Sequence, residues 1–341
     1  MRARAASLTV LGASTLALST LACRGADAPK GSEARPFRVA FVPKGTTHEF
    51  WRTMHAGALR AQIGVRARGV HVDLVWKGPL REDDREQQVQ VVESFAAQGM
   101  DGIVLAPLDA RALVRPVEDA RRLGVPAVIV DSALDSDAIV SFVATDNVRG
   151  GAMAADALGR LLGGKGRALL LRYQEGSAST GQREEGFLAR LRSAWPGVEL
   201  LVADQYAGVT VDTAKRAAEN LLNRHGRDFQ GVFVVNETST NGMLLALQDA
   251  GLAGGVKLVG FDGTPGLVAA MRAGHLHAFV LQDPMRMAAQ AVETMVEHLQ
   301  GRPVPKRIDT EAVVVAPENL DTPGVRALLE PPQDEEAPPG Q

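Results

Sequence analysis

The chain has 341 residues, of which 45% are hydrophobic and 23% charged, a composition typical of a globular protein long enough for two domains. Its formal net charge is −3, and it has no basic run with interleaved aromatic residues, so no nucleic-acid partner is expected. The single cysteine, Cys23, excludes an internal disulfide and a metal site built from several cysteines.

The N-terminal segment predicts export. Arg2 and Arg4 precede an uncharged, apolar and small-residue stretch over 5–22, which is typical of a signal peptide and too weakly hydrophobic for a permanent span. Cys23 follows the sequence STLA, which resembles a bacterial lipobox, so residues 1–23 are expected to be a signal peptide and Cys23 the site of lipidation. Conventional cleavage beside an unmodified cysteine stays open. Residues 24–36 are polar and small, which predicts a flexible tether.

The rest of the chain alternates between two patterns. Short apolar runs rich in β-branched residues predict strands over 37–42, 70–76, 101–106, 126–131 and 139–144, and again over 167–173, 197–203, 230–236, 256–262 and 276–281. Longer segments with apolar residues at helical spacing predict helices over 49–62, 86–98, 110–123, 148–162, 184–193, 211–224, 241–250 and 265–273. Because the two halves match in order and spacing, the sequence predicts an α/β protein of two similar, doubly wound parallel-sheet lobes.

The residues that follow the strands carry the predicted chemistry. The first strand leads into a loop that is longer and more polar than a connector requires, with Lys44 and His48 beside Phe50 and Trp51. Ligands of open parallel sheets bind beyond the carboxyl ends of the strands. Other strand ends are polar as well, with Asp131, the segment 174–183, Asn236 and Asp262. Carboxylate, amide and guanidinium groups beside aromatic faces suit a polyhydroxylated ligand held between two lobes.

Each of these residues also has an ordinary interpretation. Asp131 and Asp262 could cap the turns that follow them, and Arg183 could be a surface charge on a helix. Phe50 and Trp51 could be core residues, although neighbours about 100° apart on a helix cannot both point into the core. The run REDDREQQ (81–88) would ordinarily be a solvated helix start. The shared position at strand ends in both halves favours the binding site.

Five short motifs together carry a resemblance to a known family. The segments VSFVATDN (140–147), REEGF (183–187), VFVVNE (232–237), VGFDGTP (259–265) and VLQDP (280–284) resemble periplasmic sugar-binding proteins of the ribose/galactose type and the effector domains of LacI-type repressors. The resemblance implies the type I periplasmic binding fold, with two lobes joined by three hinge crossovers. These crossovers would divide the chain into an N-terminal lobe at 37–145 plus 283–309 and a C-terminal lobe at 146–282 plus 310–322. Residues 323–341 are expected to form a disordered tail.

The resemblance also implies a set of ligand-binding residues. His48, Phe50 and Trp51 stand where ribose-type proteins have an amide and two aromatics, and either ring could stack on the ligand. Asp131, Arg183, Asn236, Asp262 and Gln282 match the remaining positions, and Lys44 joins them as an unusual first-lobe residue. Ser132 stands where arginine is frequent, which makes ribose itself a doubtful ligand.

The expected function is therefore that of an exported, monomeric solute-binding protein. It would reside in the periplasm or cell envelope, deliver a sugar or polyol to an ABC permease, and contact the membrane only through its lipid anchor. A sensory protein that presents its ligand to a chemoreceptor or sensor kinase is the alternative. A LacI-type regulator is disfavoured, because it would need a DNA-binding helix-turn-helix before the sensor domain, whereas only 36 residues precede the first strand and they are typical of a signal peptide.

Catalysis is not expected. The segment GRLLGGKG (159–166) approaches a phosphate-binding loop, but Gly166 replaces the required Ser or Thr, and the segment follows a helix rather than a strand. No nucleophile elbow and no HExxH metal motif is present, and the histidines are scattered. No cofactor and no metal is predicted.

Overall fold

The computed structural model describes residues 35–330. The expected signal peptide, Cys23, most of the expected tether and the end of the tail lie outside these residues. The described elements up to residue 145 are β1 (Phe37–Val42), α1 (Glu49–Ala67), β2 (Val72–Trp76), α2 (Arg85–Ala97), β3 (Gly102–Leu105), α3 (Val114–Arg122), β4 (Ala127–Val130) and β5 (Ser141–Thr145).

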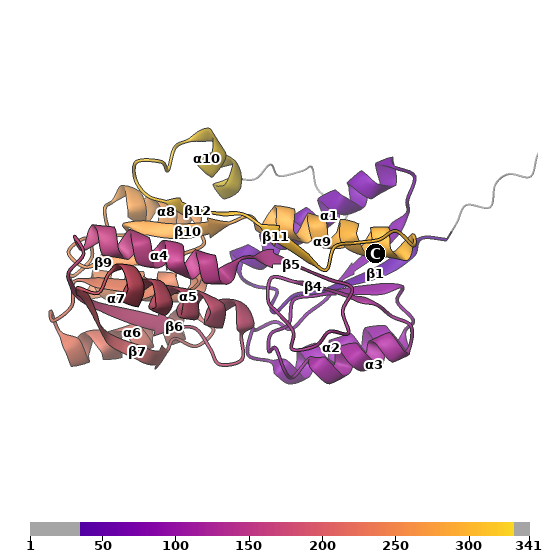
Figure 1. The fold of residues 1–341 in the computed structure, drawn as a ribbon, viewed down its shortest axis with the longest axis horizontal. Coiled ribbons are helices and arrows are strands. Elements are labelled where there is room, and N and C mark those ends of the chain that lie inside the picture. Colours follow the sequence, from indigo (N-terminus) through magenta and orange to yellow (C-terminus); the bar gives the residue numbers. More distant parts are fainter. Residues whose placement is uncertain (1–34, 331–341) are drawn as a thin grey trace, which may run out of the picture. The chain divides into compact units, whose positions relative to one another are not determined.

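The second half of the chain repeats this alternation and then adds returning segments (Figure 1). Its elements are α4 (Asn147–Leu161), β6 (Gly166–Arg172), α5 (Ala178–Ala194), β7 (Val198–Tyr206), α6 (Val211–His225), β8 (Gly231–Val234), α7 (Glu237–Asp249), β9 (Lys257–Phe261), α8 (Pro265–Arg272), β10 (Ala278–Gln282), α9 (Pro284–Leu299), β11 (Arg307–Thr310), β12 (Ala312–Val315) and α10 (Pro323–Leu329).

Two six-stranded sheets confirm the predicted fold class. The first has the strand order β11-β5-β4-β3-β1-β2 and the second the order β12-β10-β9-β8-β6-β7. All described pairings are parallel except that of β12, which runs antiparallel to β10. The chain passes from one lobe to the other at Asp146, at Asp283 and at Glu311. Asp146 and Asp283 also accept a hydrogen bond from a backbone N–H of the helix that follows, so each crossover begins a capped helix.

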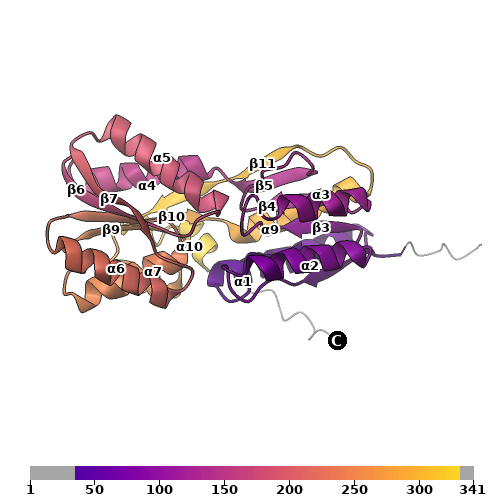
Figure 2. The same cartoon turned by 90° about the horizontal axis from the view of Figure 1, so that it is seen from below.

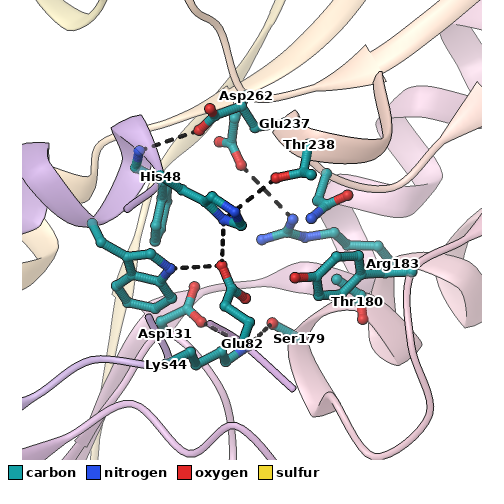
Figure 3. Close-up of a pocket in the computed structure, with 14 residues that line it drawn as sticks. Lys44, His48, Glu82, Asp131, Ser179, Thr180, Arg183, Glu237, Thr238 and Asp262 are labelled. Carbon is teal, nitrogen blue, oxygen red and sulfur yellow. Dashed lines mark hydrogen bonds and ion pairs between the residues drawn. The ribbon is translucent and has the colours of Figure 1, made fainter. Parts of the chain in front are cut away.

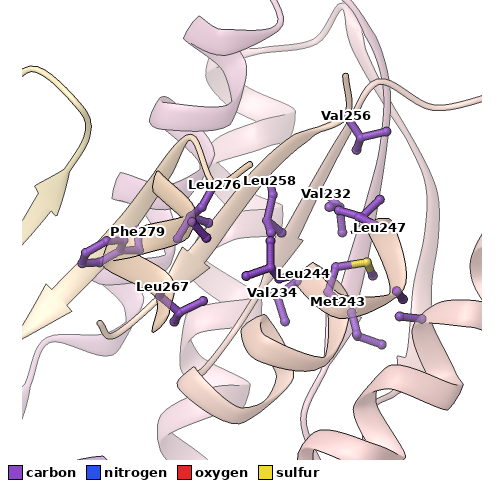
Figure 4. Close-up of a cluster of buried hydrophobic side chains, with 14 of the residues drawn as sticks. Val232, Val234, Met243, Leu244, Leu247, Val256, Leu258, Leu267, Leu276 and Phe279 are labelled. Carbon is purple, nitrogen blue, oxygen red and sulfur yellow. The ribbon is translucent and has the colours of Figure 1, made fainter. Parts of the chain in front are cut away.

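Helices cover both faces of each sheet, which explains why the strands are apolar on both sides. In the second lobe, α4 and α5 lie on one face and α6 and α7 on the other (Figure 2). Figure 4 shows the core beneath the latter pair, where Val232, Val234 and Leu258 of the sheet meet Met243 and Leu247 of α7. In the first lobe, α1 and α9 contribute to one buried cluster and α2 and α3 to the other.

Several helices differ from the sequence-based expectation. Helix α9 was not anticipated. Its apolar positions Met287, Ala291 and Met295 face the first sheet and are fully buried. Helix α5 begins at Ala178 and α7 at Glu237, several residues earlier than predicted. The polar first turns of both helices masked their helical spacing. Because α5 begins earlier than predicted, Arg183 lies inside a helix and not in the loop before it.

The tail prediction is corrected in part. Residues 323–329 were expected to be disordered, but they form α10. Val325 is buried, and Leu328 and Leu329 pack against the core of the second lobe, so apolar burial holds this short helix in place. The predicted disorder of 331–341 lies outside the described residues. Among the helices of the described part, none is long and apolar enough to cross a membrane.

Candidate ligand-binding site

A pocket lies where the carboxyl ends of strands from both lobes meet (Figure 3). It holds about 380 Å³ of empty space, its open mouth included. Its walls combine ionisable, amide, hydroxyl and aromatic side chains, namely Lys44, His48, Phe50, Trp51, Glu82, Asp131, Tyr173, Ser179, Thr180, Arg183, Asn236, Glu237, Thr238 and Asp262. The open parallel-sheet arrangement therefore places the polar strand ends where a ligand is expected.

Two strand-end aspartates occupy the same unusual backbone conformation. Asp131 follows β4 with φ 63°, and Asp262 follows β9 with φ 62°; no other non-glycine residue of the described chain has a positive φ. The backbone N–H of Asp131 donates to Val143 O (3.0 Å), and that of Asp262 donates to Val280 O (2.7 Å). Left-handed backbone at a non-glycine residue costs free energy and is concentrated at functional sites. Thr264, rather than Asp262, caps the next helix.

Lys44 joins the two lobes at the base of the pocket. Its Nζ lies 3.1 Å from Asp131 Oδ2 and donates to Ser179 Oγ (3.0 Å) and Ser177 Oγ (3.3 Å) of the second lobe. Only 3% of Lys44 is exposed, so its charge is compensated mainly by Asp131. Ser132 Oγ, at the position where arginine was expected from the family, accepts a hydrogen bond from Ser179 N (3.1 Å).

Arg183 is fixed by the second lobe. Its Nε donates to Asn147 Oδ1 (2.8 Å), its Nη1 donates to Val235 O (3.0 Å), and its guanidinium carbon lies 3.8 Å from the centre of the Phe261 ring. Nη1 also lies 3.8 Å from Asp262 Oδ2. Burial lowers the pKa of Arg183, which the charge of Asp262 opposes, and burial raises the pKa of Asp262, which the charge of Arg183 opposes. The two groups stabilise each other's charged form.

Close helix packing sets the position of Arg183. Gly151 of α4 lies against α5, and a Cβ built there would come within 1.9 Å of Arg183 O. Any larger residue at 151 would therefore push the helix that carries Arg183 away from α4.

The first-lobe wall is organised around Glu82, a residue that the sequence analysis did not select. Glu82 Oε1 lies 2.6 Å from His48 Nδ1 and accepts a hydrogen bond from Trp51 Nε1 (2.8 Å). Burial would lower the pKa of His48, but the hydrogen bond and charge of Glu82 raise it overall. Burial would raise the pKa of Glu82, but the hydrogen bond and charge of His48 lower it overall. An ion pair of imidazolium and carboxylate follows.

Phe50 and Trp51 both line the pocket, and they differ in burial. Trp51 is 3% exposed and packs in the first core, while Phe50 is half-buried. Their rings meet edge to face with centroids 5.0 Å apart. The indole of Trp51 is held in one orientation by Glu82, so both rings offer fixed apolar surface to the pocket.

The second-lobe wall comes mainly from the start of α7. Asn236 caps the helix by accepting a hydrogen bond from Ser239 N, and Glu237 and Thr238 follow in its first turn. Thr238 Oγ1 lies 3.4 Å from His48 Nδ1, which is a further contact between the lobes. Asn236 therefore serves the helix with its side-chain oxygen and keeps its amide nitrogen for other partners.

Gln282 is the one predicted site residue that does not line the pocket. It is 1% exposed, and its Nε2 donates to Asp262 Oδ1 (3.0 Å) and Oδ2 (3.1 Å). Gln282 thus orients a pocket residue from behind. The other predicted residues, Lys44, His48, Phe50, Trp51, Asp131, Arg183, Asn236 and Asp262, all lie in the lining.

Several lining residues were not among the predicted ligand-binding residues, although Ser179 and Thr180 lie in the polar strand-end segment 174–183. The full set is Glu82, Tyr173, Ser179, Thr180, Glu237 and Thr238. Tyr173, Glu237 and Thr238 follow β6 and β8 closely, so their place after strands was the available signal. Glu82 sits in an acidic run that resembled a solvated helix start, although only Asp84 of that run caps α2. No cluster of three or more potential metal ligands occurs within residues 35–330.

Comparisons with known proteins agree with this geometry. The profile of the family described as periplasmic binding protein domain matches residues 39–303. The ribose import binding protein of Bacillus subtilis is 31% identical over 71% of this chain and 75% of its own length. The D-ribose/D-allose-binding protein of Pseudomonas aeruginosa is 28% identical over 84% of this chain and 88% of its own.

Solved structures of similar fold include ligand complexes. A carbohydrate transporter solute-binding protein from Agrobacterium radiobacter, in complex with D-arabinose, is 29% identical, has a TM-score of 0.82 and covers 86% of this chain and 99% of its own. An ABC transporter solute-binding protein from Agrobacterium vitis, with bound D-fucose, is 32% identical with a TM-score of 0.80 and the same two coverages.

Proposed function

Because the chain belongs to the periplasmic binding protein domain family, we propose that it captures a monosaccharide or related polyol between its two lobes and delivers it to an ABC importer permease. The observation that carries this proposal is the pocket at the strand ends of both lobes, where Asp131 and Asp262 hold strained backbone conformations beside Arg183. Its relatives include the ribose-, allose- and arabinose-binding proteins named above.

The proposed ligand contacts follow from the groups that line the pocket. Asp131, Asp262, Arg183 and Asn236 supply acceptors and donors for ring hydroxyls, and Phe50 or Trp51 supplies the apolar face. Lys44 is paired with Asp131, and His48 is paired with Glu82. Each of them would therefore contact the ligand while it remains in its ion pair. A ligand held by both lobes would favour closure about the crossovers at Asp146, Asp283 and Glu311.

A binding experiment tests the proposal. Small molecules released from freshly purified protein should include a monosaccharide or polyol by mass spectrometry. Calorimetry against D-ribose, D-allose, D-arabinose, D-fucose and their amino derivatives should give saturable one-site binding for at least one compound. Absence of any carbohydrate, both in the released material and in the titrations, would contradict the proposed function.

We also propose that the chain is anchored in the cell envelope through Cys23, which lies outside the described residues. The support is the Arg2/Arg4 n-region, the apolar stretch before Cys23 and the polar residues after it. Cells fed a radiolabelled fatty acid should label the wild-type chain and not Cys23→Ser. Label that persists in Cys23→Ser, or a wild-type chain that carries none, would contradict the anchor while leaving the binding role untouched.

A further inference from the structure

The pocket lining contains one more carboxylate than it has basic groups. The acids are Glu82, Asp131, Glu237 and Asp262, and the bases are Lys44, His48 and Arg183. Each base has its own acid, with Lys44 Nζ 3.1 Å from Asp131, His48 Nδ1 2.6 Å from Glu82, and Arg183 Nη1 3.8 Å from Asp262. Glu237 is the carboxylate that remains.

Glu237 lies in the pocket wall with only a backbone partner. Its Oε2 accepts a hydrogen bond from Phe50 N (3.2 Å), and no basic side-chain nitrogen of residues 35–330 lies within 4 Å of its carboxylate. Burial raises its pKa to about 7, and the charges of Asp262 and Glu82 act in the same direction, against the Phe50 N–H and the charge of His48. The charge of His48, which is paired with Glu82, does not outweigh burial, so Glu237 has no cation of its own to hold it ionised.

A second group in the same pocket lacks a well-formed hydrogen bond. Tyr173 is 1% exposed and lines the pocket, and its hydroxyl lies close to the carboxylate of Glu82 without reaching good hydrogen-bond geometry. Burial, together with the negative charge of Glu82, raises the pKa of Tyr173 well above its ordinary value, so the hydroxyl keeps its proton. Buried hydroxyls are ordinarily satisfied, and a ligand hydroxyl or ring oxygen beside Tyr173 would give this one a well-formed hydrogen bond.

We propose that the ligand carries a positively charged amine that pairs with Glu237, so that the site takes an amino sugar or amino-cyclitol in preference to the neutral polyol. This inference rests on the proposed sugar-binding function and names the class of ligand. An ammonium group brings the missing fourth cation and donors for the free oxygen of Glu237. A neutral polyol leaves Glu237 either uncompensated or protonated, and a buried carboxylate without a partner is unfavourable. The hydroxyl of Tyr173 is then available to a ring oxygen or hydroxyl of the same ligand.

Matched pairs of ligands test the inference. D-Glucose against D-glucosamine, D-galactose against D-galactosamine, and myo-inositol against an inosamine differ only by hydroxyl and amine. In calorimetry on the purified chain at pH 7, the amine of at least one pair should bind about 100-fold more tightly than its neutral partner. Glu237→Gln keeps the acceptor for Phe50 N but removes the charge, so it should bring this ratio close to one.

The control is Glu199→Gln, which makes the same charge change on an exposed position of β7 in the same lobe. It should leave the ratio of amine to neutral affinity as in the wild type. Neutral sugars that bind as tightly as their amines would overturn this inference and leave the sugar-binding function standing. A preference for amines that Glu237→Gln does not reduce would overturn the role of Glu237. Failure of every neutral and amino compound to bind would overturn the proposed function along with the inference.

Discussion

Replacing Arg183 with alanine is expected to abolish ligand binding and also to lower the free energy of unfolding by about 3–5 kcal/mol. The guanidinium is 3% exposed and is the hydrogen-bond partner of Asn147 Oδ1 and Val235 O. Its removal leaves these two acceptors unsatisfied and Asp262 without its cation. These contacts make Arg183 part of the second-lobe structure as well as of the pocket lining. Denaturant unfolding and calorimetry on the same preparation measure the two effects.

Arg190→Ala is the matched control for this experiment. Arg190 lies on the same helix, α5, and pairs with Asp156 at the surface, where solvent screening leaves ion pairs with little effect on stability. Its removal should leave both binding and unfolding close to wild type. An Arg183→Ala chain that unfolds like the wild type would show that the contacts to Asn147 and Val235 contribute little. One that binds ligand normally would mean that the pocket has been misplaced.

Replacing Asp262 with asparagine is expected to weaken ligand binding by about 100-fold. Asparagine tolerates the left-handed backbone at this position, so the fold is kept while the charge is lost. The carboxylate is the counter-charge of Arg183, and both of its oxygens accept a hydrogen bond from Gln282 Nε2. An amide at this position has only one oxygen, so its NH₂ group would face the N–H groups of Arg183 or Gln282. The neutral amide would also accept hydrogen bonds from ligand hydroxyls less strongly than the carboxylate does.

Asp204→Asn is the control for the charge change, since Asp204 is exposed on β7 of the same lobe. Calorimetry with the identified ligand should separate the two variants, and circular dichroism should show the same secondary structure for both. Asp262→Asn with wild-type affinity would rule out a charged hydrogen bond between this carboxylate and the ligand.

The alternation of strand and helix patterns was enough to predict the two-lobed α/β fold. Apolar runs such as 101–106 and 230–236 have no polar face, and only a sheet covered on both sides satisfies them. Strand ends are visible in the sequence because polar residues follow the apolar run. Since parallel strands present their carboxyl ends at one edge, Asp131 and Asp262 could be selected before any contact was known. The first turns of α5 and α7 were missed because their polar starts hide the helical period, and the apolar spacing of helix α9 was not recognised.

Tertiary structure alone decided which charges meet. Lys44 and Asp131 are far apart in the chain, as are His48 and Glu82, and nothing in local spacing pairs them. Glu82 looked solvated because its neighbours are acidic and basic, and it is buried only because His48 and Trp51 pack over it. The same pairings leave Glu237 without a cation of its own. Gln282 lies behind Asp262, to which it donates a hydrogen bond, and not in the pocket wall. Local sequence reports residue type and element ends, whereas charge compensation depends on distances that only the packed lobes establish.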